Sequence, residues 1–308
     1  MQATPTAFTD TDGDSRRQAR RGLAIFFAIV VVLSAPIEAG IIITHAVDDL
    51  ILSILWLTVW AAVPTTASVV ARLVLREGFS DVSFRFGGRR GRKAMVQTLI
   101  FPVVVGLLAY GIAWASGLIA HFGSPAPEIG SWGLWAIAIA AALILNIIHD
   151  SGEEIGWRGY ALTRLIDSGM PRPVLASGLL WGLCHAPLYL WGGFAQGQPP
   201  LLATALLMVG TTALGYVLAR MRLETGSIWP AIALHVTWNV IIQIGFDELA
   251  SGASKAIWVG ETGVLTTLVL IVAAVIYSRG RWTILREPPK RETTSVHQEG
   301  VGAQPRVQ

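Results

Sequence analysis

Residues 132–160 read WGLWAIAIAAALILNIIHDSGEEIGWRGY, an apolar run that ends in a group of charged side chains. A helix of about 20 apolar residues spans the roughly 30 Å hydrocarbon core of a bilayer. Seven other stretches meet or approach that length, so the sequence predicts an all-α, polytopic membrane helix bundle of about eight transmembrane helices. The expected segments are residues 23–46, 50–71, 96–120, 132–148, 174–191, 201–219, 228–245 and 257–277.

The composition of the whole chain agrees with a single membrane domain. Of 308 residues, 53% are hydrophobic and 14% are charged, against about 25% charged in an average soluble domain, and the mean hydropathy is +0.57. These values exclude a disordered chain and an ordinary soluble enzyme. The one cysteine, Cys184, excludes an internal disulfide and a cysteine-cluster metal site, and we expect it to be a packing residue.

The basic residues predict the orientation of the bundle. The chain has 23 Lys and Arg against 20 Asp and Glu, a formal net charge of +3. With a cytoplasmic N-terminus, every Lys and Arg except Lys255 falls in a segment on the cytoplasmic side, as the positive-inside rule requires. Both termini are therefore expected in the cytoplasm, and the basic residues mark orientation and predict no nucleic-acid partner.

Two polar tails flank the predicted membrane domain. Residues 1–22 and 279–308 are expected to be disordered cytoplasmic tails, and residues 23–278 form the membrane domain. The segment 84–93 carries two adjacent glycines and a run of basic residues. It is either a signal that sets membrane orientation, the reading that we favour, or an interfacial element that contacts anionic lipid.

Three groups of polar residues lie in or beside the predicted spans, where ionisable side chains are costly and usually functional. In the first, Glu154 and Arg158 are spaced i and i+4 and can pair on a helix, whereas Glu153 is rotated by about 100° and lacks that partner. Glu153 is therefore the candidate general base. A helix end solvated at the membrane surface would explain the same residues without catalysis.

The second and third groups lie on later spans. His185 ends the stretch Trp181-Gly-Leu-Cys-His185, and His235 precedes Asn239 by one helical turn. Each group alone is explained by hydrogen bonds between membrane helices. Because all three groups approach from the same leaflet, we expect them to converge.

The order and spacing of these motifs resemble those of the CPBP family of intramembrane proteases, which includes CAAX prenyl endopeptidases and bacteriocin-processing or self-immunity homologues. The resemblance covers residues 132–246. The family usually has Phe where this chain has Trp181, which we interpret as a packing change. The resemblance implies a water-containing cavity open to the cytoplasmic leaflet. It also implies roles for six residues: Glu153 and His185 activate water, His235 and Asn239 hold the oxyanion, and Glu154 and Arg158 order the site.

A metal site is the alternative to water activated by protein groups alone. His185, His235 and Glu153 are ligand types that zinc accepts, with water in the fourth position. The spacing of His235 and Asn239 suits an oxyanion hole better, so we expect catalysis without a cofactor and keep zinc as the alternative.

The predicted function is that of an intramembrane endopeptidase. Its expected partners are membrane lipid and a peptide or membrane-protein substrate, either prenylated or otherwise attached to the membrane. One alternative is a peptide-binding or self-immunity protein that uses the same residues without turnover. A proton- or ion-coupled transporter is a weaker alternative, because the intramembrane polar residues gather in one leaflet. The compact chain shows no organelle-targeting signal, so we expect the bacterial plasma membrane.

Overall fold

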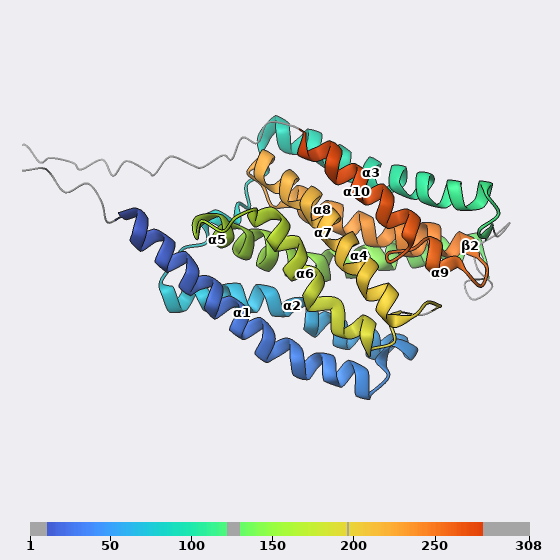
Figure 1. Cartoon of the computed structure of the whole chain (residues 1–308), viewed down its shortest axis with the longest axis horizontal. Coiled ribbons are helices and arrows are strands. Elements are labelled where there is room, and N and C mark those ends of the chain that lie inside the picture. The colour runs from blue at the N-terminus through green and yellow to red at the C-terminus, as the bar shows by residue number, and fades with distance from the viewer. Residues whose placement is uncertain (1–10, 122–129, 196, 280–308) are drawn as a thin grey trace, which may run out of the picture.

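The computed structural model describes residues 11–121, 130–195 and 197–279. Within these residues the chain is a polytopic bundle of α-helices, as predicted, with one short pair of strands (Figure 1). The main helices are α1 (Thr11–Ile43), α2 (Leu50–Leu75), α3 (Gly88–Ala115), α4 (Trp132–Gly156), α5 (Leu162–Asp167), α6 (Pro173–Leu190), α7 (Pro200–Thr225), α8 (Trp229–Trp238), α9 (Lys255–Trp258) and α10 (Val264–Ser278).

Shorter elements complete the described chain. Two π-helical segments, η3 (Trp157–Ala161) and η4 (Asn239–Phe246), directly follow α4 and α8. The 3₁₀ turns are η1 (Ala46–Asp48), η2 (Ser80–Val82) and η5 (Asp247–Leu249), and strands β1 (Ala120–His121) and β2 (Ala250–Ser251) pair antiparallel.

Seven helices of the described chain are long and apolar enough to cross a membrane. The eighth expected span, residues 257–277, is shorter than predicted, because the chain turns at Gly260 with a φ of 87° and α10 begins only at Val264. Its 15 residues reach about 22 Å as a helix, less than the roughly 30 Å of a hydrocarbon core.

Two predicted boundaries are wrong. Residues 11–22 belong to α1 and not to a disordered tail: Ala19 is buried, and Arg20 donates to the carbonyl oxygen of Ser168. The predicted span 132–148 ends too early, because the chain stays helical through η3 and α5 to Asp167 and buries Trp157 and Tyr160, and only residues 168–172 connect it to α6. The expected disorder of residues 1–10 and 280–308 lies outside the described residues.

Helices α4, α6 and α8 carry the three motifs and each packs against its neighbours, α4 on α2 and α8, α6 on α7, and α8 on α3. Figure 1 shows α1 and α2 on one side, α3 and α10 on the opposite side, and the remaining long helices between them. Gly152 and Gly156 let α4 approach α2 closely: a Cβ atom would lie 2.7 Å from the Ala61 oxygen and 2.4 Å from Pro64, respectively. Small residues one turn apart are a common means of close helix contact in membranes.

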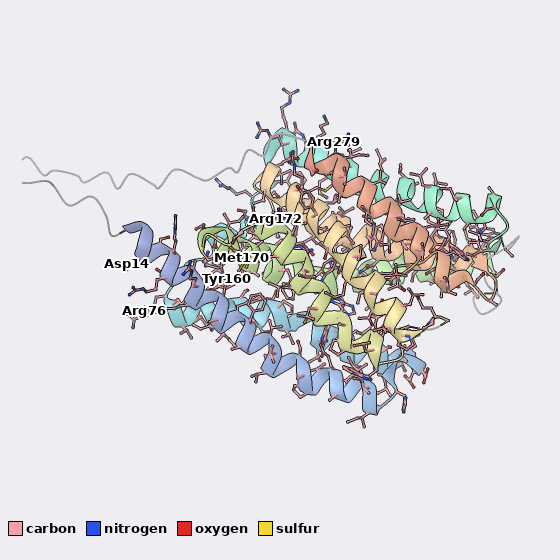
Figure 2. All side chains as sticks on the ribbon, viewed as in Figure 1. Asp14, Arg76, Tyr160, Met170, Arg172 and Arg279 are labelled. Atoms are coloured by element: carbon pink, nitrogen blue, oxygen red, sulfur yellow. The ribbon has the colours of Figure 1, made fainter. Side chains whose placement is uncertain are left out.

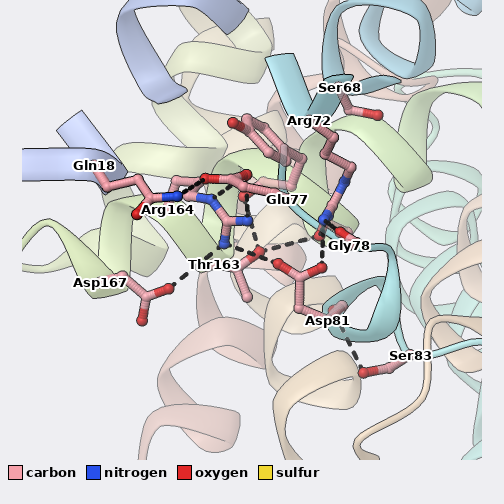
Figure 3. Close-up of polar contacts among 12 residues, drawn as sticks. Gln18, Ser68, Arg72, Glu77, Gly78, Asp81, Ser83, Thr163, Arg164 and Asp167 are labelled. Carbon is pink, nitrogen blue, oxygen red and sulfur yellow. Dashed lines mark hydrogen bonds and ion pairs between the residues drawn. The ribbon is translucent and has the colours of Figure 1, made fainter. Parts of the chain in front are cut away.

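The helix ends on the expected cytoplasmic side share one end of the bundle. Asp14, Arg76, Arg172 and Arg279 lie together toward the upper left of Figure 2. An ionic network at this end joins the α2–α3 connection to α5 (Figure 3), where Arg164 pairs with both Glu77 and Asp81. The grouping agrees with the predicted sidedness, while the orientation of the bundle in a cell stays a prediction.

Candidate active site

The first motif forms a buried ion pair at the end of α4. Glu154 Oε1 accepts a hydrogen bond from Arg158 Nη1 at 2.6 Å, and both side chains are 0% exposed. This is the i,i+4 pairing expected from the sequence. Glu153 points elsewhere and keeps 8% of its side chain exposed, so the two adjacent glutamates have different surroundings.

Trp181 of α6 contacts all three motifs. Its indole Nε1 donates to Glu153 Oε2 at 2.7 Å, and its ring lies 4.3 Å from Arg158 Cζ. It also meets the rings of His185 and His235 edge to face, with centroids 5.6 and 5.1 Å apart. Reading Trp181 as only a packing change was therefore wrong, because a phenylalanine has no N–H with which to bind Glu153.

The second motif places His185 beside Glu153. His185 Nδ1 lies 2.9 Å from the carbonyl oxygen of Trp181, which can only accept, so Nδ1 carries the proton. In the neutral ring Nε2 is then an acceptor, and it lies 3.9 Å from Glu153 Oε2. A contact of this length suits a bridging water better than a direct hydrogen bond.

The third motif lies on α8 and is linked to α4. His235 Nδ1 lies 3.1 Å from Glu154 Oε1, and its Nε2 lies 3.9 Å from Asp150 Oδ1. Asn239 Nδ2 donates to the same Asp150 oxygen at 3.2 Å. The two predicted oxyanion donors therefore both face one carboxyl oxygen, that of Asp150, a residue to which sequence reasoning gave no role.

Both catalytic helices change their winding beside these residues. The α4 helix becomes the π-helix η3 three residues after Glu154, and α8 becomes η4 at Asn239. Such π-helical turns are rare and occur often at functional sites. No pattern in the sequence indicated them.

Two further side chains reach the site from α1 and α2. Trp60 meets the ring of His185 edge to face, with centroids 4.6 Å apart, and its Nε1 donates to Glu38 Oε1 at 3.0 Å. Both side chains are buried. The signal that could have found Glu38 is a carboxylate inside the first apolar run, where charge is costly.

The three side chains considered as zinc ligands do not gather as a metal site. In the parts of the chain that the structure describes, no three His, Cys, Asp or Glu side chains form a group that could hold a metal ion. His185 and His235 each turn one ring nitrogen to a protein acceptor, Trp181 and Glu154 respectively. Zinc-binding histidines commonly hold their second ring nitrogen in this way, so these contacts do not argue against zinc. The misfit rests on the grouping of the side chains in the described residues alone, and no catalytic step is assigned to a metal.

Comparison with known proteins supports the interpretation of this geometry. Residues 130–241 match the family model described as type II CAAX prenyl endopeptidase Rce1-like. This part of the chain is similar to the Rce1-like family. The resemblance predicted from the three motifs is thereby confirmed. No curated protein matches the chain.

The Rce1-like region contains all six residues predicted for the site, together with Asp150 and Trp181. Glu38 and Trp60 lie outside it. The match supports the general class of CAAX-type intramembrane endopeptidases for this chain. The seven long apolar helices of the described residues support an integral membrane protein.

Proposed function

We propose that this protein hydrolyses a peptide bond of a membrane-associated substrate, with water activated between Glu153 and His185. The observation that carries the proposal is the pairing of these two side chains. They come from different helices, face each other at 3.9 Å, and are held in place by the same tryptophan, Trp181. Both keep some exposure, 8% for Glu153 and 16% for His185, whereas Glu154 and Arg158 have none.

The first chemical step is the attack of water on the substrate carbonyl carbon. Water held between Glu153 and the unprotonated Nε2 of His185 gives its proton to this pair as the new C–O bond forms. The pair then returns a proton to the amide nitrogen when the C–N bond breaks, so one water molecule becomes part of the two new termini. Trp181 supports this step by orienting the Glu153 carboxylate and by fixing the tautomer of His185.

The negative charge that develops on the carbonyl oxygen is held by Asn239 and by the imidazolium form of His235. His235 must carry both ring protons for this role, because its Nδ1–H already binds Glu154 and only Nε2–H is left for the substrate. N–H groups aimed at such an oxygen supply much of the rate enhancement in acyl-transfer enzymes. Asp150 already accepts from Asn239 and lies near His235 Nε2. We assign Asp150 as a positioning residue that keeps both donors turned toward the site before substrate binds.

Glu154 and Arg158 stabilise the site without touching the substrate. Both are fully buried, and Glu154 also holds His235 Nδ1. A single carboxylate oxygen thus joins the first motif to the third. This arrangement supports the ordering role that the family resemblance implies for the pair.

A membrane-attached substrate suits the position of α4. Of the 18-residue apolar stretch within the Trp132–Asp167 helix, only 6% is buried inside the protein. Its outer face is therefore available to lipid along most of its length, while its end carries the catalytic carboxylates. A prenylated or otherwise lipid-anchored peptide could reach the site along this face without leaving the bilayer.

The experiment is a terminus-selective mass-spectrometric comparison of membrane peptides from cells with the wild-type protein and cells with Glu153→Ala at matched expression. New termini that occur only with the wild type support hydrolysis and identify a substrate. Glu77→Ala is a matched control, because it removes a glutamate from the ionic network and not from the site. Identical peptide sets, with a phenotype that still depends on Glu153, would favour the alternative of a peptide-binding or self-immunity protein.

A further inference from the structure

Two adjoining cavities lie on the side of the bundle that is remote from the active-site helices α4 and α6. The first has a volume of about 280 Å³ and is lined by residues of α3 and α7, among them Arg90, Lys93 and Gln97. The second has a volume of about 350 Å³ and lies between α3 and α10, which run side by side in Figure 1. Gln97 lines both cavities, so a polar chamber and an apolar groove adjoin at this residue.

The polar chamber has an excess of positive charge. Arg90 and Lys93 are exposed on α3. The one carboxylate of the lining, Glu224, already accepts a hydrogen bond from Arg220 Nε at 2.5 Å. The two α3 cations therefore remain available to an anion. Basic pockets between membrane helices on the cytoplasmic side are suited to anionic lipid headgroups.

The groove has the composition and the length of a lipid chain site. Apart from Gln97 and a tyrosine its lining is aliphatic or phenylalanine, including Ile100, Val104 and Ala273. On α3 it extends from Gln97 to Leu108, about 16 Å at the rise of an α-helix. That length is close to half of the roughly 30 Å hydrocarbon core, which is the thickness of one leaflet.

We propose that this combined site binds one anionic phospholipid of the cytoplasmic leaflet. Its phosphate lies at Arg90 and Lys93, and one acyl chain lies in the groove between α3 and α10. The segment 84–93 then does more than set orientation, because its last turn holds a specific lipid. A phospholipid is favoured over a free anion because the chamber adjoins, at Gln97, an apolar groove of one leaflet's length.

The test is native mass spectrometry of the full chain released from nanodiscs that contain phosphatidylglycerol or phosphatidylcholine. We expect the wild type to retain one phosphatidylglycerol in preference to phosphatidylcholine. The double variant Arg90→Gln/Lys93→Gln should weaken this retention roughly tenfold or more, because each basic side chain near the surface contributes to anionic-lipid binding. The matched control Arg89→Gln/Arg92→Gln removes the same charge from the same turns at residues that do not line the chamber, and it should leave retention within about twofold of the wild type.

Two further measurements separate the parts of the proposal. Val104→Trp fills the groove and leaves the cations intact, so we expect it to weaken phosphatidylglycerol retention as well. Equal losses in both double variants would overturn a specific site and indicate general surface charge. Displacement of the lipid by inorganic phosphate, or no effect of Val104→Trp, would overturn the assignment of a lipid chain to the groove. Circular dichroism of each variant confirms that the helices are retained.

Discussion

The active site and the ionic network at the cytoplasmic end are both built from buried charges, but their charges balance differently. In the network three carboxylates, Glu77, Asp81 and Asp167, meet an equal number of arginines. Arg72 and Arg164 pair with these carboxylates (Figure 3), and Arg222 donates to the backbone oxygen of Asp81. The active site instead gathers Asp150, Glu153 and Glu154 around one arginine, Arg158.

The difference indicates what each cluster is for. A balanced set of ion pairs with good geometry holds segments together, and breaking one pair leaves an uncompensated charge. An excess of carboxylates beside two histidines creates groups that can exchange protons, which catalysis requires. The network therefore fixes the α2–α3 connection to α5. The excess of carboxylates in the candidate active site is what the proposed activation of water by Glu153 and His185 requires.

The largest effect on activity is expected from His185→Ala. The variant removes the ring that shares water with Glu153, so kcat should fall by about 10²- to 10⁴-fold, the range of general acid–base catalysis. The measurement is turnover of the substrate peptide by purified protein in detergent, beside a melting curve. A variant that folds normally and cleaves at the wild-type rate would contradict the role of His185.

A smaller loss is expected from Trp181→Phe. Phenylalanine keeps an aromatic ring against Arg158 but removes the N–H that binds Glu153, and a hydrogen bond to a charged group contributes about 1.5 to 3 kcal/mol. We expect kcat to fall roughly 10- to 100-fold. Trp229→Phe is the matched control, because it removes an indole N–H that binds the backbone oxygen of Phe84 and no residue of the site. Equal losses in the two variants would show that the contact with Glu153 has no special role.

Asp150→Asn should have a more modest effect. Asparagine can still accept from Asn239, but it lacks the charge that faces His235, so the two donors are held less firmly. We expect a fall in kcat of about tenfold with little change in KM. Steady-state kinetics separate the two parameters. A change confined to KM would show that Asp150 acts in substrate binding and not in positioning the donors.

Asp81→Asn tests the ionic network, and it should affect the stability of the protein and not its chemistry. Asp81 is 28% exposed but pairs with fully buried Arg72. Removing its charge should lower the free energy of unfolding by about 1 to 3 kcal/mol, less than for a completely buried pair. Denaturant titration in detergent measures this change. The kcat of the folded fraction should stay within about twofold of the wild type.

The smallest effect is expected from Cys184→Ala. The thiol adjoins His185 in sequence, but its Sγ atom lies 4.0 Å from Ser34 Oγ on α1. It faces α1 and has no part in water activation, so kcat should change by less than about twofold. Loss of turnover in this variant, with normal folding, would favour a cysteine nucleophile over activated water.

The sequence alone determined the class of fold and the location of the chemistry. Apolar runs of membrane length are a local property, and so is the i,i+4 spacing of Glu154 with Arg158, so both could be read without a structure. The three motifs and their order were sufficient to indicate the Rce1-like region and its six candidate residues. The extent of α1 and the helical continuation through residues 157–167 could not be read, because contacts with distant segments override the polar composition there.

Only the tertiary structure decided how the motifs work together. The bond from Trp181 to Glu153, the position of Asp150 between His235 and Asn239, and the approach of Trp60 to His185 all join separate helices. Such contacts depend on the angles and distances at which helices pack, which close contacts such as that of Gly152 with α2 determine. A residue pattern records which side chains a helix presents, but the partner that each side chain meets is set by packing across the bundle.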